Sequence, residues 1–227
     1  MPVVILLVVV VAGLIAYGVY TYNKKHRDLL AAWAAAEQWT YTARDDSFTR
    51  RWSGKPFDAG HSRRAQNILA GSFDGRAAIA FDYQYQETSG AGQNRSESTY
   101  KFSVYVLEMP CFLPRVSVGP EGFFSKVGHA VGVHDIQLES EAFNRAYRVT
   151  AADEKLAYDL LPARTMEALL AQTGVHLRTE GTSLLCFDTN WLAPARIDAR
   201  LRLMDAFLAN VPSFVWHDHG APDAGAH

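Results

Sequence analysis

The pattern of hydrophobic and polar positions changes abruptly after residue 22. Residues 2–22 carry no charged side chain, and almost all of them are Val, Ile, Leu, Ala, Gly or Tyr. About 20 apolar residues are needed to cross roughly 30 Å of hydrocarbon, and a helix satisfies its own backbone polar groups there. The pattern therefore predicts a transmembrane anchor over residues 1–23, which crosses the lipid bilayer with residues 2–22.

The residues after the apolar run indicate an orientation. A cleaved signal sequence is the alternative to an anchor, but it would have basic residues before a shorter apolar run. Here Lys24, Lys25 and Arg27 follow the run directly. Because basic residues are retained on the cytoplasmic side, we expect a single-pass protein of the cell membrane with its N-terminus outside and its C-terminal domain in the cytoplasm. Cys111 and Cys186 form no Cys-x-x-Cys pair, which agrees with a reducing compartment.

Residues 24–38 extend the helical pattern beyond the membrane. They are rich in Leu, Ala and Trp and lack Gly and Pro, so their helical propensity is high. We expect a helical stalk that joins the anchor to one cytoplasmic domain of residues 39–216. Residues 217–227, rich in Gly, Ala, Asp and His, are expected to be a disordered tail.

Beyond residue 39, several segments alternate with the period of a β-strand. In residues 77–86 one face carries large apolar side chains and the other carries small or polar ones, which predicts one face on the core and one in solvent. The first set is Ile79, Phe81, Tyr83 and Tyr85, and the second is Ala78, Ala80, Asp82, Gln84 and Gln86. A turn at Asp74-Gly75 follows a strand over residues 65–72, and a strand over residues 97–108 precedes a break between Pro110 and Pro114.

Helical patterns are concentrated later in the chain. We expect helices over residues 123–130, over residues 154–161 with Asp153 as its cap, and over residues 164–172. Residues 175–180 and 183–187 predict a hairpin through Gly181-Thr182. A final helix from Pro194 carries its apolar residues, Ile197, Leu201, Met204 and Leu208, on one face. The pattern predicts an α+β fold: an N-terminal transmembrane helix, then one domain with a mainly antiparallel β-sheet and helices, closed by a C-terminal amphipathic helix.

One stretch of the domain carries a family resemblance. Its residues are the run ESEAFNRAYRV at 139–149, then Asp153, Ala157, Tyr158, Leu161, Pro162, Met166 and Leu170. Looser likeness extends over Pro56-Phe57, Arg63-Arg64, Gly75-Arg76, Phe81-Asp82-Tyr83, Tyr100 and Pro120-Glu121-Gly122. The chain resembles an uncharacterised, actinobacterial-type family of bacterial single-pass membrane proteins. The resemblance implies one membrane-anchored domain of unassigned function and supplies no catalytic or binding residue.

Composition and charge limit the expected partners. The formal net charge is -2 and the isoelectric point is about 6.4, so no nucleic acid is expected as a partner. Basic residues after the anchor and early in the domain could contact anionic lipid or a membrane-protein partner, although a solvated surface is the simpler alternative. These candidate contacts are Lys24, Lys25, Arg27, Arg50, Arg51, Lys55, Arg63 and Arg64.

The sequence lacks motifs of known chemistry. It contains no Gly-x-Ser-x-Gly, His-Glu-x-x-His or Gly-Lys-Ser/Thr motif, and the histidines of the 217–227 tail would not be held in place as metal ligands. We therefore predict a membrane-anchored cytoplasmic binding or scaffolding domain without enzymatic turnover, cofactor or metal, whose oligomeric state stays open. The alternative is an enzyme with an unrecognised site near His129, His134 and Asp135, where a general base is conceivable.

Overall fold

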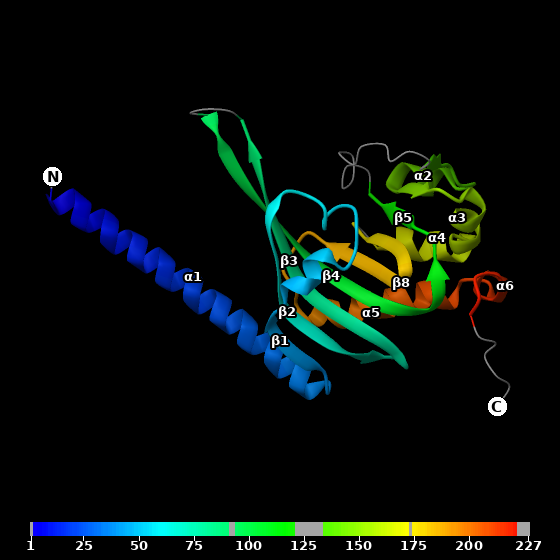
Figure 1. Cartoon of the computed structure of the whole chain (residues 1–227), viewed down its shortest axis with the longest axis horizontal. Helices are drawn as coiled ribbons and strands as arrows, with labels where there is room; N and C mark the ends of the chain where they lie inside the picture. Colours follow the sequence, from blue (N-terminus) through cyan, green and yellow to red (C-terminus); the bar gives the residue numbers. More distant parts are fainter. Residues whose placement is uncertain (1, 91–93, 121–133, 173, 222–227) are drawn as a thin grey trace.

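The computed structural model describes residues 2–90, 94–120, 134–172 and 174–221. Helix α1 (Pro2–Ala36) is continuous through the predicted anchor and most of the predicted stalk (Figure 1). Among the described residues it is the one helix long and apolar enough to cross a membrane, and its apolar part is not buried. Figure 1 shows this part projecting away from the sheet, with the C-terminal part of α1 beside β1 and β2. An N-terminal helix that could anchor the chain in a membrane is therefore present.

The strands of the described chain form one antiparallel sheet. They are β1 (Thr40–Arg44), β2 (His61–Phe73), β3 (Arg76–Ser89), β4 (Ser96–Leu113), β5 (Val116–Gly119), β6 (His134–Ile136), β7 (Arg148–Ala151) and β8 (His176–Asp188). Their order across the sheet is β1-β2-β3-β4-β8-β5-β7-β6, so β8 is inserted between β4 and β5. The predicted turn at Asp74-Gly75 joins β2 to β3, and both residues have the positive φ (47° and 77°) that a two-residue hairpin turn favours.

Helices surround this sheet. They are the 3-10 helix η1 (Asp46–Arg50) and the α-helices α2 (Glu141–Ala146), α3 (Glu154–Leu160), α4 (Ala163–Leu170), α5 (Pro194–Ala209) and α6 (Ser213–Asp218). Asp153 caps α3 as predicted, with its Oδ1 accepting a hydrogen bond from the backbone N of Leu156 at 3.1 Å. The predicted apolar face of α5 is buried. The α+β fold is therefore confirmed.

Both faces of the sheet are covered, which differs from the expectation for β3. Helices α1 and α5 lie on one face, where Leu69, Ala80 and Tyr105 are fully buried. On the other face, η1 and residues 51–60 cover a cluster rich in aromatic side chains. Ala78, Ala80 and Asp82, expected in solvent, are buried because the predicted stalk and α5 cover their face.

Two predicted interruptions of strands are wrong. Strand β8 is not a hairpin but one strand, which pairs with β5 through its first half and with β4 through its second. Strand β4 continues through Pro110 to Leu113, with a register shift after Glu108. Gly181 (φ 64°) pairs with Leu113, so both strands bend at the same place. Pro110 therefore falls in an irregular part of the ladder, where a missing backbone N–H is tolerated.

The ends of the chain also bear on the predictions. His217 and Asp218 belong to α6 rather than to a disordered tail, since Val215 of this helix is buried in the core. Residues 222–227 and the predicted helix over residues 123–130 lie outside the described residues.

Candidate functional site

Helix α1 meets the sheet at a buried carboxylate. Asp82 on β3 is fully buried, and donors from three separate segments surround it. The backbone N of Leu192 donates to its Oδ1 at 2.6 Å, the Asn67 Nδ2 donates to Oδ2 at 2.8 Å, and the His26 Nε2 lies 3.1 Å from Oδ2. The Tyr41 hydroxyl in turn donates to the Asn67 Oδ1 at 2.8 Å. Because a buried carboxylate needs such partners, Asp82 joins α1, β2 and the segment before α5.

Apolar contacts continue this attachment toward the C-terminal end of α1. Leu30 and Ala34 are buried in the core on the α1 face of the sheet. The Trp33 ring lies edge-on to the Trp39 ring, with 5.4 Å between centroids. Trp39 in turn covers Gly71, where an added Cβ would come within 2.5 Å of the indole. The helix is therefore packed on the sheet along its last three turns.

These contacts also give the direction of β3 relative to the apolar span. Ala78 of β3 is paired with the glycine under Trp39, whereas Asp82 contacts His26. Strand β3 therefore runs from the C-terminal end of α1 toward the span. A helix rises about 1.5 Å per residue, so the attachment at His26 begins about 6 Å after Tyr22, the last residue of the predicted span.

Some of the predicted basic residues lie at this end of the sheet. Gln84 on β3 pairs with Arg64 on β2 and with Lys101 on β4, two residues beyond Asp82 and on the same face. Arg64 is exposed, and the Lys101 Nζ lies 4.9 Å from the centroid of the Trp191 ring. The sheet end next to the span thus carries Arg64 and Lys101. The exposed basic residues on the adjoining part of α1 are Lys24, Lys25 and Arg27.

The remaining predicted basic residues lie on or beside η1 and residues 51–60, which we call the covering segment of the opposite face. Arg50 is exposed at the end of η1. The Arg51 guanidinium lies 5.2 Å from the centroid of the Trp52 ring. The Arg63 Nη2 donates to two backbone carbonyls of residues 58–60, each at 3.4 Å. The predicted basic region is therefore divided between two faces of the sheet.

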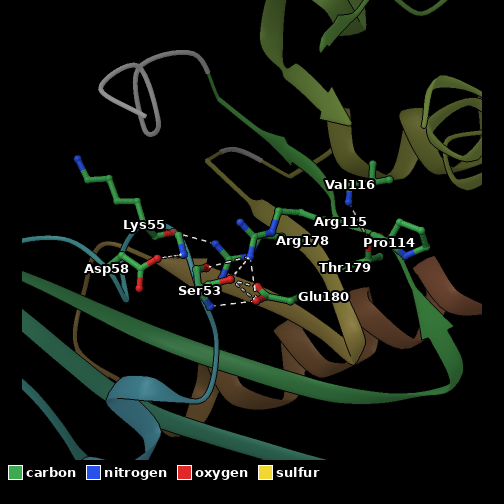
Figure 2. A network of polar contacts seen from close by, with 10 residues as sticks. Ser53, Lys55, Asp58, Pro114, Arg115, Val116, Arg178, Thr179 and Glu180 are labelled. Atoms are coloured by element: carbon green, nitrogen blue, oxygen red, sulfur yellow. Dashed lines mark hydrogen bonds and ion pairs between the residues drawn. The ribbon is translucent and has the colours of Figure 1, made fainter. Parts of the chain in front are cut away.

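A polar cluster holds residues 51–60 onto the sheet (Figure 2). The backbone N and the hydroxyl of Ser53 donate to the Glu180 Oε1 at 2.9 and 2.8 Å. The Arg178 Nη1 donates to the Lys55 carbonyl at 2.8 Å. The Arg115 Nη2 donates to the Ser53 hydroxyl at 2.6 Å and lies 2.8 Å from the Glu180 carboxylate. We call Ser53, Arg115, Arg178 and Glu180 the loop clamp; in Figure 2 the Lys55 side chain points away from it.

Arg178 is the buried cation of the loop clamp. Its side chain is 3% exposed, its Nη2 lies 3.2 Å from the Glu180 Oε2, and its guanidinium lies 5.1 Å from the Phe187 ring centroid. Burial lowers the pKa of Arg178 to about 10, against the opposing effect of Glu180, so the side chain stays charged at neutral pH. A buried charge is tolerated only when it is paired. Arg178 thus contacts other residues of the same domain, which indicates a structural role.

The structure describes two of the three residues of the predicted enzymatic alternative. His134 and Asp135 are exposed on β6, and Asp135 accepts hydrogen bonds from the Arg148 Nε and Nη2 at 2.8 and 2.6 Å. His129 lies outside the described residues. Within the described ranges, no group of three or more His, Cys, Asp or Glu side chains could hold a metal ion. The placed members of this alternative are therefore an exposed histidine and a carboxylate engaged by arginine.

Sequence reasoning missed the buried charged residues that connect the segments. Asp82 stands between two large aromatic residues in a strand, whereas Arg178 lies in a run that mixes apolar and polar residues. Asp188, at the end of β8, is also buried and lies 2.9 Å from the Arg200 Nη2 on α5. A charge next to large apolar residues is the signal that could have indicated Asp82 and Asp188, because such a charge is seldom buried without a partner; the sequence around Arg178 carries no such signal.

Comparisons with known proteins give a fold but no family. No protein-family model matches the chain, and no curated protein matches it. A solved structure is similar: the crystal structure of the mycobacterial trehalose monomycolate transport factor A, TtfA. The two chains are 13% identical with a TM-score of 0.61, and the match covers 82% of this chain and 96% of that chain. At this identity the similarity extends to the fold alone, which the two chains share over most of their lengths.

Proposed function

We propose that this protein is a membrane-anchored adaptor without enzymatic turnover. Its α+β domain would be held in one fixed pose at the cytoplasmic surface of the membrane and would bind other components of a membrane transport process there. The observation that carries the proposal is the continuity of α1, whose apolar part leads without interruption into a part buried against the domain.

This attachment differs from an ordinary tether. A flexible linker lets a domain rotate and sample a wide volume, whereas His26, Leu30 and Ala34 are packed within the last three turns of α1. The domain therefore presents the same faces to the membrane and to its neighbours. A fixed pose serves an adaptor, because binding is strengthened when the bound arrangement is formed in advance.

Two further observations support the proposed role in membrane transport and the proposed side of the membrane. The fold is shared with a protein named as a transport factor, which motivates a role in membrane transport. Lys24, Lys25 and Arg27 favour the cytoplasmic side by the positive-inside rule. With Arg64 and Lys101 at the same end of the sheet, they would attract anionic lipid headgroups by about 1 kcal/mol each. We also propose that the chain belongs to the uncharacterised actinobacterial-type family that its sequence resembles.

The fixed pose is tested with the full-length protein in its native membrane. A biotin ligase is fused to the C-terminus, and the biotinylated neighbours of the wild type are compared with those of a variant carrying six Gly and Ser residues between Asn23 and Lys24. Both proteins should remain in the membrane, and the wild type should label a recurring set of integral membrane proteins. The insertion should lower that labelling at least fivefold.

A second insertion serves as the control, and two results would contradict the proposal. The same insertion after Gly220, beyond α6, should leave the labelling unchanged. Identical neighbours for the wild type and the Asn23–Lys24 insertion would mean that a simple tether suffices, and labelling of soluble proteins alone would remove the membrane adaptor role. A reporter fused to the C-terminus would reveal the side of the membrane.

A further inference from the structure

The hairpin of β3 and β4 extends beyond the rest of the sheet. Figure 1 shows the paired ends of β3 and β4 projecting on the same side as the N-terminal part of α1. The outermost pair between β2 and β3 is His61 with Gln86, and the pairing of β4 with β8 begins at Ser103. In the strand pairing of the described ranges, residues 87–89 and 96–98 pair only with each other, and the His61 Nε2 lies 3.1 Å from the Thr88 Oγ1. We call residues 86–90 and 94–99 the hairpin arm.

The hairpin arm reaches past the end of the apolar span. Ser89 lies seven residues after Asp82, which is at the level of His26. A strand rises about 3.3 Å per residue, so this distance is roughly 23 Å. From His26 back to Tyr22, α1 covers only about 6 Å. The two lengths differ by about 17 Å, and β3 runs toward the span. After an allowance for the angle between the strand and the helix, the arm extends on the order of 10 Å or more beyond the level of Tyr22.

The side chains of the hairpin arm do not suit lipid. Residues 94–99 are all exposed, and the arm consists of Gln, Glu, Thr, Ser, Gly, Asn and Arg in its described part. Hydrocarbon excludes exposed strand edges and charged side chains, and the headgroup layer is only about 5 to 7 Å deep on each side. The span has little length to spare for tilting, because its 21 residues cover about 31 Å and the hydrocarbon about 30 Å.

We propose that the hairpin arm docks against a polar, water-accessible recess of an integral membrane protein beside the anchor. This inference rests on the proposed adaptor function and names the class and location of its partner. A protein is favoured over anionic lipid because the arm carries Glu87 and Glu97 against the single cation Arg95. At the base of the arm, the Tyr100 ring is 38% exposed and stacks on Tyr85 with 5.1 Å between centroids, which offers a rigid aromatic contact.

Cysteine accessibility in the full-length protein tests whether a membrane protein covers the hairpin arm. Ser98→Cys places a thiol on the arm, and Ser213→Cys places one on the exposed start of α6 as the matched control; Cys111 and Cys186 are buried. A membrane-impermeant maleimide is applied in detergent, in liposomes of pure lipid with an anionic component, and in native membranes opened by freeze–thaw. We expect Ser98→Cys to react at least tenfold more slowly in native membranes than in the other two, and Ser213→Cys to react alike in all three.

Each other outcome overturns the inference. Equal reaction of Ser98→Cys in native membranes would mean that nothing covers the arm, and slow reaction in pure lipid would mean that lipid covers it. Introducing the Asn23–Lys24 insertion into Ser98→Cys should restore fast reaction in native membranes. If Ser98→Cys reacts fast from the start while the insertion still changes the biotinylated neighbours, the arm inference fails and the adaptor function stands. If neither measurement responds, both fail.

Discussion

At the scale of single residues, buried polar groups join segments that are far apart in the sequence. Asp82 gathers donors from α1, β2 and the segment before α5, and Arg178 joins β8 to the covering segment. Apolar packing alone tolerates many arrangements, whereas a buried carboxylate leaves its donors unsatisfied if any segment shifts. Asp82 therefore selects the register in which α1 lies on the sheet, and Arg178 fixes the position of residues 51–60.

Replacing Asp82 should measure the strength of this attachment. Asp82→Ala leaves the Leu192 amide and the Asn67 side chain without their acceptor, and each unsatisfied buried group costs about 1 to 3 kcal/mol. We expect the free energy of unfolding to fall by about 3 kcal/mol in denaturant titrations. Asp198→Ala removes an exposed pair with Arg202 and should leave the free energy of unfolding almost unchanged. A loss below 1 kcal/mol in Asp82→Ala would contradict the joining role.

The cysteines should report global unfolding. Cys111 and Cys186 are free and buried, and burial raises the pKa of both thiols. A raised thiol pKa keeps the reactive thiolate scarce as the pH increases through 7 to 9. We expect neither cysteine of the folded protein to react with a disulfide reagent at pH 8, and both to react in denaturant. Rapid reaction of one thiol in the folded state would reveal local opening at that strand, by comparison with a Cys→Ala variant at the other.

The sequence indicated some residue roles and concealed others. The Asp153 cap was predictable because Asp before a helix start has a local effect. The burial of Ala78, Ala80 and Asp82 was not, because their pattern is that of a solvated face. Helices α1 and α5 cover them, and the position of α1 depends on contacts more than 40 residues away in the chain. A period of two reveals that two faces differ, but not what lies on the second face.

At the scale of elements, the pairing of distant strands decides what local signals mean. Gly181-Thr182 has the composition of a turn, but β8 stays extended because β4 and β5 each pair with one half of it. Turn residues in such a strand serve a bend rather than a reversal. Strands β2, β3 and β4 were predictable because they pair with neighbours along the chain, whereas the place of β8 between β4 and β5 was not.

Breaking the loop clamp should increase the hydrogen exchange of the whole segment 51–60. Glu180→Gln removes the carboxylate beside the buried Arg178, and breaking a buried pair from one side costs about 3 to 5 kcal/mol. We expect hydrogen exchange to rise in residues 51–60 with β3 unchanged. Arg115→Gln removes a partner that is 39% exposed and should cost about 1 kcal/mol or less. Equal exchange in both variants would mean that Arg178 does not depend on Glu180.

At the scale of the whole molecule, α1 belongs to both parts of the protein. Its first half has the length and composition of a membrane span, and its second half completes the core on one face of the sheet. The boundary between the apolar part and the packed part therefore lies inside one continuous helix rather than in a linker. Because α1 is packed on the sheet, the direction of its apolar part is fixed relative to the sheet and to the hairpin arm.

Two truncations should separate the roles of the two halves of α1. A chain of residues 22–221 keeps His26, Leu30 and Ala34 in place and should unfold cooperatively as a soluble protein. A chain of residues 37–221 exposes the face under α1 and leaves Asp82 without its His26 contact. Burying a Leu side chain is worth about 1.5 to 3 kcal/mol, so with Ala34 and Asp82 the loss should reach about 4 kcal/mol, measured by thermal melting and size-exclusion chromatography. Equal melting temperatures would make α1 a tether, and the fixed pose would then lack its physical basis.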